Sequence, residues 1–325
     1  MSKKLGIDLG ASTTFIYLQS KGIVIRESTA IAVEANTFKI SATGTEAHVV
    51  FGRIPGSITL KYPFADGITD YNAAVELMTS FFNKMKHNGI IVKRPTVLCS
   101  VSCGADEDER AALEDVLMRA GCRNVTLIDK PYAAALGARL DISRDHPVMI
   151  ADIGGGATEI AVFSGGRVLN AVSINVGGRM FSNALAAYIR KKYNLFISDK
   201  TAETLKKTYG TVNEKHDRGN AIVHGRNFST GLPGTIEISS PEIRKVLSRQ
   251  IMKIAEQILV ALEEIGEEYA ETIIEDGITI CGGSAMLDGI DMLLSEYMDI
   301  PVKIALDPQD CIAEGLGLMI DNDDK

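Results

Sequence analysis

Residues 148–162 read VMIADIGGGATEIAV, with a β-branched run before a triple glycine and an apolar run after it. This pattern predicts two antiparallel strands joined by a turn whose backbone N–H groups stay uncovered. Such a turn can bind phosphate through Gly154, Gly155 and Gly156. Asp152, at the end of the first strand, would reach a magnesium ion on that phosphate through water, because magnesium gives up its hydration shell reluctantly. The alternative is an ordinary glycine-rich hairpin, since short glycine motifs also occur without a ligand.

A second copy of the pattern lies near the N-terminus, where residues 5–18 read LGIDLGASTTFIYL. Asp8 stands in the place of Asp152, and a small, hydroxyl-rich turn replaces the triple glycine. The residues of that turn are Gly10, Ala11, Ser12 and Thr13. Repetition over half the chain predicts two similar lobes, each offering one phosphate-binding hairpin to a shared cleft.

A third glycine-rich turn follows a predicted strand at 278–280. Its residues are Gly282, Gly283, Ser284 and Ala285. We expect a helix to start at about Ala285, where free backbone N–H groups favour an anion or a nucleotide edge.

The composition sets limits on fold and partners. A chain of 325 residues exceeds one comfortable hydrophobic core, so two lobes are expected. Its 46% hydrophobic and 23% charged content is typical of a soluble globular protein, and a net charge of −8 argues against nucleic acid as a partner. The five cysteines show no metal-ligand spacing and fit a cytosolic protein. Without an apolar signal region or a membrane-spanning apolar run, we expect a chain that is neither secreted nor transmembrane.

Other catalytic signatures fail. No Gly-Lys-Ser/Thr ending of a P-loop is present, and a dinucleotide fingerprint that starts at Gly154 fails at Glu159, where the third glycine should stand. The residues from Gly282 resemble a nucleophile elbow until Met286, which replaces the final glycine. These mismatches argue against a P-loop enzyme, a dinucleotide-binding enzyme and an esterase.

Hydrophobic periodicity predicts alternating strands and helices, hence an α/β sheet in each lobe. We expect strands over 5–33, 93–102, 125–128 and 278–280, and helices after Asp70 and over 105–120, 131–140, 183–192 and 310–320. A long helix should start at Ser240-Pro241 and bury one apolar stripe. Residues 34–62 read as short and irregular, with Gly44, Gly52 and Pro55-Gly56 as breakers. Small residues Gly315 and Gly317 should allow close packing, and the acidic end at 321–325 reads as a frayed tail without a function.

The paired hairpins and the late glycine turn resemble the superfamily of actin, sugar kinases and heat-shock chaperone ATPases. Within it, the chain is similar to the bacterial actin MreB family over nearly its whole length. The matching motifs are GIDLG at 6–10, KGIV at 21–24, GRIPG at 52–56, DGI at 66–68, LIDKP at 127–131, DIGGG at 152–156, RKKYNL at 190–195, TAE at 201–203, STGLP at 229–233 and DGI at 276–278. The late turn departs from the family's Thr-Gly-Gly-Gly-Ala, with Cys281 for threonine and Ser284 for the third glycine.

The resemblance implies an actin-like ATPase fold in the α/β class, with two lobes that each hold a mixed sheet flanked by helices and a nucleotide cleft between them. Lobe I would span 1–140, with an outer subdomain at 34–62 and a returning C-terminal helix at 310–325. Lobe II would span 141–309, with an outer subdomain at 180–240. The implied function is a cytoplasmic protein that binds ATP and Mg²⁺ and polymerises with itself into cytoskeletal filaments for cell shape or motility. A sugar-kinase-like phosphotransferase and a chaperone-like ATPase module are the alternatives on the same fold, although the chain leaves little room for a sugar site or a client-binding domain.

The resemblance also suggests roles for particular residues. Glu203 and Lys206 fall in a segment that lies against adenine and ribose in the family; without the family match, they read as a surface pair on an amphipathic helix. The family's water-positioning glutamate and threonine are replaced by Lys130 and Ala157, which implies weak or absent ATP hydrolysis. We expect Asp129 to point away from the nucleotide, and the Lys130 ammonium to pair with the γ-phosphate.

A membrane surface is a further candidate partner. Residues 84–94 read KMKHNGIIVKR, with an aliphatic tip that includes Ile90 and Ile91 between basic flanks. This pattern suits insertion at an anionic bilayer on the inner face of the membrane, and relatives often use an apolar loop here. The alternative is that residues 90–92 begin the next buried strand.

Overall fold

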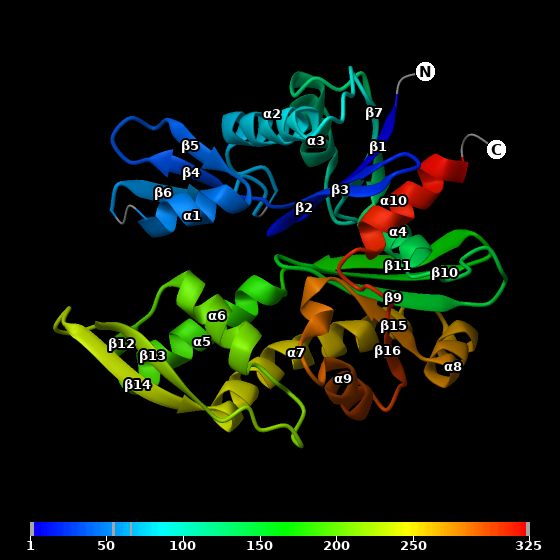
Figure 1. Ribbon diagram of the computed structural model, residues 1–325. Helices are drawn as coiled ribbons and strands as arrows, with labels where there is room; N and C mark the ends of the chain where they lie inside the picture. The colour runs from blue at the N-terminus through cyan, green and yellow to red at the C-terminus, as the bar shows by residue number, and fades with distance from the viewer. Residues whose placement is uncertain (1–2, 54–55, 66, 323–325) are drawn as a thin grey trace. The chain divides into compact units, whose positions relative to one another are not determined.

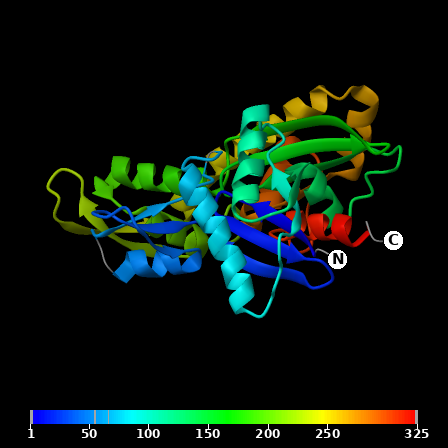
Figure 2. The same ribbon diagram turned by 90° about the horizontal axis from the view of Figure 1, so that it is seen from above.

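A computed structural model describes residues 3–53, 56–65 and 67–322 (Figures 1 and 2). The chain forms two compact units, one of Met1–Asp141 with Asp310–Lys325 and one of Ile142–Gln309. Ile54 and Pro55 of the 52–56 motif, Asp66 of the 66–68 motif and tail residues 323–325 lie outside the described residues.

The main sheet of unit 1 has the strand order β3-β2-β1-β7-β8. Its strands are β1 (Lys4–Leu9), β2 (Thr13–Leu18), β3 (Gly22–Ser28), β7 (Thr96–Val101) and β8 (Asn124–Asp129). The first three strands run antiparallel as a meander, while β7 and β8 join parallel to β1. The helices of this unit are α1 (Thr45–Arg53), α2 (Tyr71–His87), α3 (Glu107–Arg119), α4 (Lys130–Gly137) and α10 (Cys311–Asn322).

Successive side chains of β1 point to opposite faces of this sheet, and different helices cover the two faces. Leu5 and Ile7 belong to the core cluster that also contains the apolar faces of α2 and α3. Gly6 points the other way, where an added Cβ would lie 2.9 Å from Leu316 of α10. Because side chains alternate along a strand, Asp8 shares the face of Gly6. Helices α4 and α10 lie side by side at this face (Figure 1).

Close packing of α4 against α10 depends on small residues, as expected for Gly315. An added Cβ at Gly315 would lie 1.8 Å from the carbonyl oxygen of Ala133, and one at Gly317 would lie 2.5 Å from the Tyr17 ring. The end of α10 is also held, since Asp321 accepts a hydrogen bond from the Tyr17 hydroxyl (2.9 Å). The expectation of a frayed tail is therefore wrong for Asp321.

The expectation of an irregular segment at 34–62 is wrong. Strands β4 (Ile31–Glu34), β5 (Ile40–Thr43) and β6 (Ile58–Lys61) form a sheet in the order β5-β4-β6, and α1 packs against it. Gly44 does not break the structure; its positive φ of 69° turns the chain from β5 into the helix. Gly52 lies inside α1.

The main sheet of unit 2 repeats the topology of unit 1, with the order β11-β10-β9-β15-β16. Its strands are β9 (Val148–Ile153), β10 (Thr158–Ser164), β11 (Arg167–Ile174), β15 (Ile278–Cys281) and β16 (Val302–Ile304). Again three antiparallel strands are followed by two that join in parallel. The internal repeat predicted from the two hairpins thus extends over five strands in each unit.

Helices and a second sheet complete unit 2. These elements are α5 (Gly178–Tyr193), α6 (Asp199–Tyr209), α7 (Ser240–Glu263), α8 (Glu267–Asp276), the 3₁₀ helix η1 (Gly283–Met286) and α9 (Ile290–Met298), and the sheet β12-β13-β14 of Leu195–Phe196, Asn220–Asn227 and Pro233–Ser239. The apolar stripe of α7 is buried in the core of the unit, as predicted from its periodicity.

Several predicted boundaries are wrong for local reasons. The strand expected from Lys93 starts at Thr96, because Arg94 has a φ of 47° and Pro95 follows it. The helix expected at 183–192 already begins at Gly178. Around Ala285 the chain forms only the short η1. The next α-helix, α9, begins after Gly289, which has a φ of 81°.

Candidate functional site

The two predicted hairpins have the same turn geometry. In unit 1 the Gly10 N–H donates to the Thr13 carbonyl at 3.1 Å, and in unit 2 the Gly154 N–H donates to the Ala157 carbonyl at 2.9 Å. An added Cβ at Gly10 would lie 2.5 Å from the carbonyl oxygen of Thr13, so this turn closes only around glycine. Each turn leaves two middle residues, neither of them fully buried, whose N–H groups can face an anion.

The turn of unit 1 is supported by the strand beside it. The Ser12 carbonyl accepts hydrogen bonds from the Thr29 N–H (3.0 Å) and from the Ser28 hydroxyl (3.4 Å). His48, from α1, lies 2.8 Å from the same Ser28 hydroxyl. The middle of the turn is therefore fixed to the segment that leads from the main sheet to the small one.

Asp8 lies at the end of β1 and is only 6% exposed. Its Oδ1 accepts a hydrogen bond of 2.6 Å from the Ser100 hydroxyl on the neighbouring strand β7. A short bond between a hydroxyl and a carboxylate is a strong one, so it fixes the orientation of the Asp8 side chain.

Asp152 occupies the matching place in unit 2 and is also 6% exposed. Its Oδ1 lies 3.7 Å from the Cys281 thiol on the neighbouring strand β15. Gly282 follows with a φ of 88°, and an added Cβ there would lie 2.3 Å from the same carboxylate oxygen. The first glycine of the late turn therefore gives Asp152 the room that it occupies.

The late turn and the start of α5 both bind the hairpin turn of unit 2. The Ser284 hydroxyl donates to the Gly154 carbonyl at 2.8 Å, so the serine that replaces the family's third glycine has a local partner. The N–H groups of Gly178 and Arg179 donate to the carbonyls of Gly154 (3.0 Å) and Gly155 (2.8 Å). Gly154–Gly156 and Gly282–Ala285 are thus brought together, and the start of α5 contributes contacts that were not predicted.

Glu203 and Lys206 of α6 form a bonded pair next to these turns. Lys206 Nζ lies 2.7 Å from Glu203 and donates to the Gly178 carbonyl at 2.8 Å, and the Ser182 hydroxyl donates to Glu203 at 2.6 Å. Burial lowers the pKa of Lys206. Burial acts to raise the pKa of Glu203, but the charge of Lys206 and the hydrogen bonds from Lys206 and Ser182 outweigh it, and the pKa is lowered. With these contacts to Ser182 and Gly178, the pair is more than a solvated surface pair.

Lys130 is the first residue of α4. Its positive charge acts on the Cys99 thiol of β7, where it opposes the rise in pKa that burial and the Asp8 charge produce. The preceding Asp129 is directed at α3, where its Oδ1 accepts a hydrogen bond of 2.6 Å from Arg110. This agrees with the expectation that the side chains of Asp129 and Lys130 point in different directions.

Ala157 ends the turn of unit 2, and the polar side chains that follow it have partners of their own. The Thr158 hydroxyl donates to the Val176 carbonyl at 2.6 Å and is fully buried. Glu159, which is 2% exposed, accepts a hydrogen bond of 3.2 Å from Ser173. Neither residue replaces the hydroxyl that Ala157 lacks.

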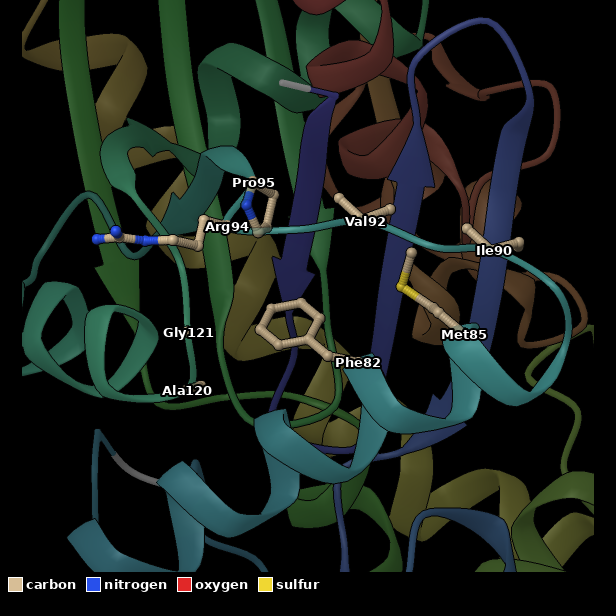
Figure 3. Close-up of a pocket in the computed structure, with 8 residues that line it drawn as sticks. All are labelled: Phe82, Met85, Ile90, Val92, Arg94, Pro95, Ala120 and Gly121. Atoms are coloured by element: carbon tan, nitrogen blue, oxygen red, sulfur yellow. The ribbon is translucent and has the colours of Figure 1, made fainter. Parts of the chain in front are cut away.

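The basic loop at 84–94 divides its aliphatic side chains between core and solvent. Ile90 and Val92 are half-buried and, with Phe82 and Met85 of α2, line a small hollow (Figure 3). Ile91 is 62% exposed. Since β7 starts only at Thr96, the alternative that residues 90–92 begin this strand is wrong.

Two negative findings limit the site. Within the described ranges, no cluster of three or more histidine, cysteine or acidic side chains could hold a metal ion by itself. Asp8 lies in unit 1 and Asp152 in unit 2. In the same ranges no helix is both long enough and apolar enough to span a bilayer.

Comparison with solved structures assigns the class of protein. The chain matches the double-helical filament of MamK with a TM-score of 0.81, at 19% identity and over 98% of both chains, which shows the fold alone. The repeated sheet topology and the paired turns are those of an actin-like protein. Crystal structures of MreB5 of Spiroplasma citri, bound to ADP and to AMPPNP, match with TM-scores of 0.91 at 34% and 35% identity; they cover 100% and 98% of this chain, which covers 99% and 96% of theirs.

The sequence comparisons give the particular family. The model of the MreB/Mbl protein family matches residues 2–325. The cell shape-determining protein Mbl of Bacillus subtilis is 35% identical over 325 residues, which are 100% of this chain and 97% of that protein. The chain therefore belongs to the MreB/Mbl family of bacterial actins.

Sequence reasoning missed two serine hydroxyls and one backbone carbonyl that hold the predicted residues in place. Ser100, Ser182 and Gly178 belong to this group, and each acts on a residue far away in the chain. Ser100 alone had a visible signal, since it is a polar residue inside an otherwise apolar buried strand.

Proposed function

We propose that this chain binds ATP with magnesium through the phosphate turns and carboxylates of its two units, and that it polymerises with itself into cytoskeletal filaments. The observation that carries the proposal is the repeated hairpin, in which a turn with open N–H groups follows a buried carboxylate in both units. The MreB5 relatives with bound ADP and AMPPNP support nucleotide binding by this chain.

The residues fit a hydrated magnesium ion. Magnesium prefers oxygen ligands and keeps several of its waters, so single carboxylates reach it through water. Asp8 and Asp152 are both buried at a strand end, and the glycine at 282 leaves room for the carboxylate that a larger residue would displace. When bound, the ion would neutralise phosphate charge, while Asp8 and Asp152 orient its water shell.

The buried pair of α6 is the proposed contact for adenine and ribose. Glu203 offers carboxylate oxygens to hydroxyl groups, and Lys206 fixes the Glu203 side chain in place. Because Lys206 also binds the Gly178 carbonyl, the pair is tied to the helix that supports the phosphate turn of unit 2.

Hydrolysis of ATP should be very slow or absent. Lys130 and Ala157 stand where relatives carry a carboxylate and a hydroxyl that position the attacking water. An ammonium cannot accept a proton or orient water as a carboxylate does, and a methyl group does neither. We infer that Lys130 pairs with the γ-phosphate and favours persistent filaments.

A role at the inner face of the cell membrane is proposed for the loop at 84–94. Ile91 is the exposed apolar side chain, and exposed Lys86, Lys93 and Arg94 flank it. An apolar tip between cations suits shallow insertion into an anionic surface. Ile90 anchors this loop to unit 1, because its side chain lines the hollow shown in Figure 3.

Calorimetric titration with ATP in the presence of magnesium tests the nucleotide assignment. Replacing Asp152 with alanine should weaken magnesium-dependent ATP binding by about 10- to 100-fold. Glu271→Ala, which removes an exposed carboxylate of α8, is the matched control and should bind as the unaltered protein does. Equal affinities of the Asp152→Ala variant and the unaltered protein would rule the assignment out.

A further inference from the structure

The two buried carboxylates receive unequal support from the strands beside them. In unit 1 the partner of Asp8 is Ser100, one residue after the Ile7–Cys99 pair of the β1–β7 ladder. In unit 2 the neighbouring strand presents Cys281 to Asp152, directly opposite it in the β9–β15 ladder. The two partners thus hold equivalent places in the repeated topology, but one carries a hydroxyl and the other a thiol.

We propose that Ser100 and Cys281 are positioning residues for the two magnesium carboxylates, and that the thiol leaves Asp152 the less firmly oriented of the two. The inference rests on the proposed function and adds to it. Magnesium affinity is then limited by unit 2, and a hydroxyl at residue 281 would raise it.

The contact distances support a firmer orientation of Asp8 than of Asp152. The Ser100 hydroxyl lies 2.6 Å from Asp8, within the range of strong hydrogen bonds to a carboxylate. The Cys281 sulfur lies 3.7 Å from Asp152, and a thiol is a weak donor. Groups that orient a metal-binding side chain commonly change metal affinity about 10- to 100-fold, so the difference in donor strength should be measurable.

Burial makes these contacts specific. Both Ser100 and Cys281 are almost fully buried, so bulk water does not compete for their contacts with the carboxylates. Gly282 permits this position of the Asp152 carboxylate at the end of β15, because an added Cβ at residue 282 would lie 2.3 Å from Oδ1. Serine in place of Cys281 is nearly the same size, and its hydroxyl is a stronger donor than the thiol, so we expect it to move closer to the same carboxylate oxygen.

Reciprocal exchange of the two partners tests the proposal with a matched control. The variants Cys281→Ser and Ser100→Cys are titrated with ATP by calorimetry, once with magnesium and once with EDTA. With magnesium, Cys281→Ser should bind ATP about 3- to 10-fold more tightly and Ser100→Cys about 3- to 10-fold more weakly. With EDTA both should match the unaltered protein, because the carboxylates act only on the ion.

The variants Ser100→Ala and Cys281→Ala test whether a change in affinity arises from loss of the donor or from disruption of the structure. Ser100→Ala should lose as much magnesium-dependent affinity as Ser100→Cys or more, whereas Cys281→Ala should lose little. The rise in thermal midpoint on adding magnesium and ATP gives a second readout that should follow the same order. A variant that does not fold is replaced in this series by the alanine variant of the same residue.

The outcomes separate this inference from the proposed function. If the unaltered protein binds ATP with magnesium but Cys281→Ser is unchanged, the positioning role is overturned and the proposed function stands. Equal shifts with magnesium and with EDTA would also overturn it, since they would show a general effect on the nucleotide turns. If the unaltered protein shows no magnesium dependence at all, the proposed function fails and this inference fails with it.

Discussion

Restoring the carboxylate and hydroxyl that relatives carry should restore ATP hydrolysis. The perturbation is Lys130→Glu combined with Ala157→Thr. In the unaltered chain the adjacent Asp129 is bound to Arg110 at 2.6 Å, and the buried Glu159 is bound to Ser173 at 3.2 Å. Neither carboxylate is positioned to replace the missing group.

The expected gain in hydrolysis rate can be estimated because both neighbouring carboxylates already have other hydrogen-bond partners. Loss of a positioned general base commonly lowers a rate about 10²- to 10⁴-fold. Because Asp129 and Glu159 are bound to Arg110 and Ser173, we expect neither to compensate. That range corresponds to about 3–5 kcal/mol in the activation barrier. Lys130→Glu alone should recover part of the rate, and the double variant more, because the hydroxyl at 157 helps only when a base is present.

Single-turnover phosphate release at saturating ATP and magnesium measures this directly. Lys191→Glu, on an exposed face of α5, makes the same change of charge away from the turns and should leave the rate unaltered. The reasoning is refuted if the unaltered protein releases phosphate as fast as relatives that retain the carboxylate. Asp129 or Glu159 would then be the substitute.

Three further predictions concern stability and the membrane. Burial acts to raise the pKa of Glu242, but hydrogen bonds from Lys192 and two tyrosines lower it from 4.5 to about 2; its stabilising contribution is therefore complete above pH 4.5 and lost as pH falls towards 2. Thermal midpoints measured between pH 7 and 2 should show this loss in the unaltered protein and a smaller one in Glu242→Gln. Ile91→Ser should abolish co-sedimentation with anionic vesicles at an unchanged thermal midpoint, whereas Ile90→Ser should lower the midpoint; unaltered co-sedimentation in both would make the loop purely structural. Gly315→Ala should lower the free energy of unfolding in urea by about 1–3 kcal/mol, because its Cβ would lie 1.8 Å from a carbonyl oxygen of α4, and an unchanged midpoint would contradict this packing.

Features set by nearby residues could be predicted from the sequence. The hairpins around Gly10 and Gly154 depend on a strand, a glycine turn and a second strand that are adjacent in the chain, and both form as expected. The buried stripe of α7 follows from helical periodicity for the same reason. The repeat of the two hairpins then led to the α/β, actin-like fold that the solved structures show.

Features set by distant residues could not be predicted in this way. The Ser100–Asp8 bond joins residues 92 positions apart, and no local pattern marks the partner. Around the small sheet of unit 1, Gly44 and Gly52 were interpreted as breakers, although Gly44 makes a tight turn after β5 and Gly52 lies within α1. Composition alone does not distinguish these uses of glycine, because the surrounding β4, β5 and β6 decide which applies.

Sedimentation with nucleotide, followed by electron microscopy of the pellet, tests the central claim most directly. We predict that the unaltered protein pellets as filaments with ATP and magnesium, and that the filaments persist because hydrolysis is slow. Asp152→Ala should remain in the supernatant under the same conditions, while the exposed-carboxylate variant Glu271→Ala should pellet normally. A protein that binds ATP but stays monomeric at all concentrations, or that forms the same filaments without nucleotide, would contradict the account.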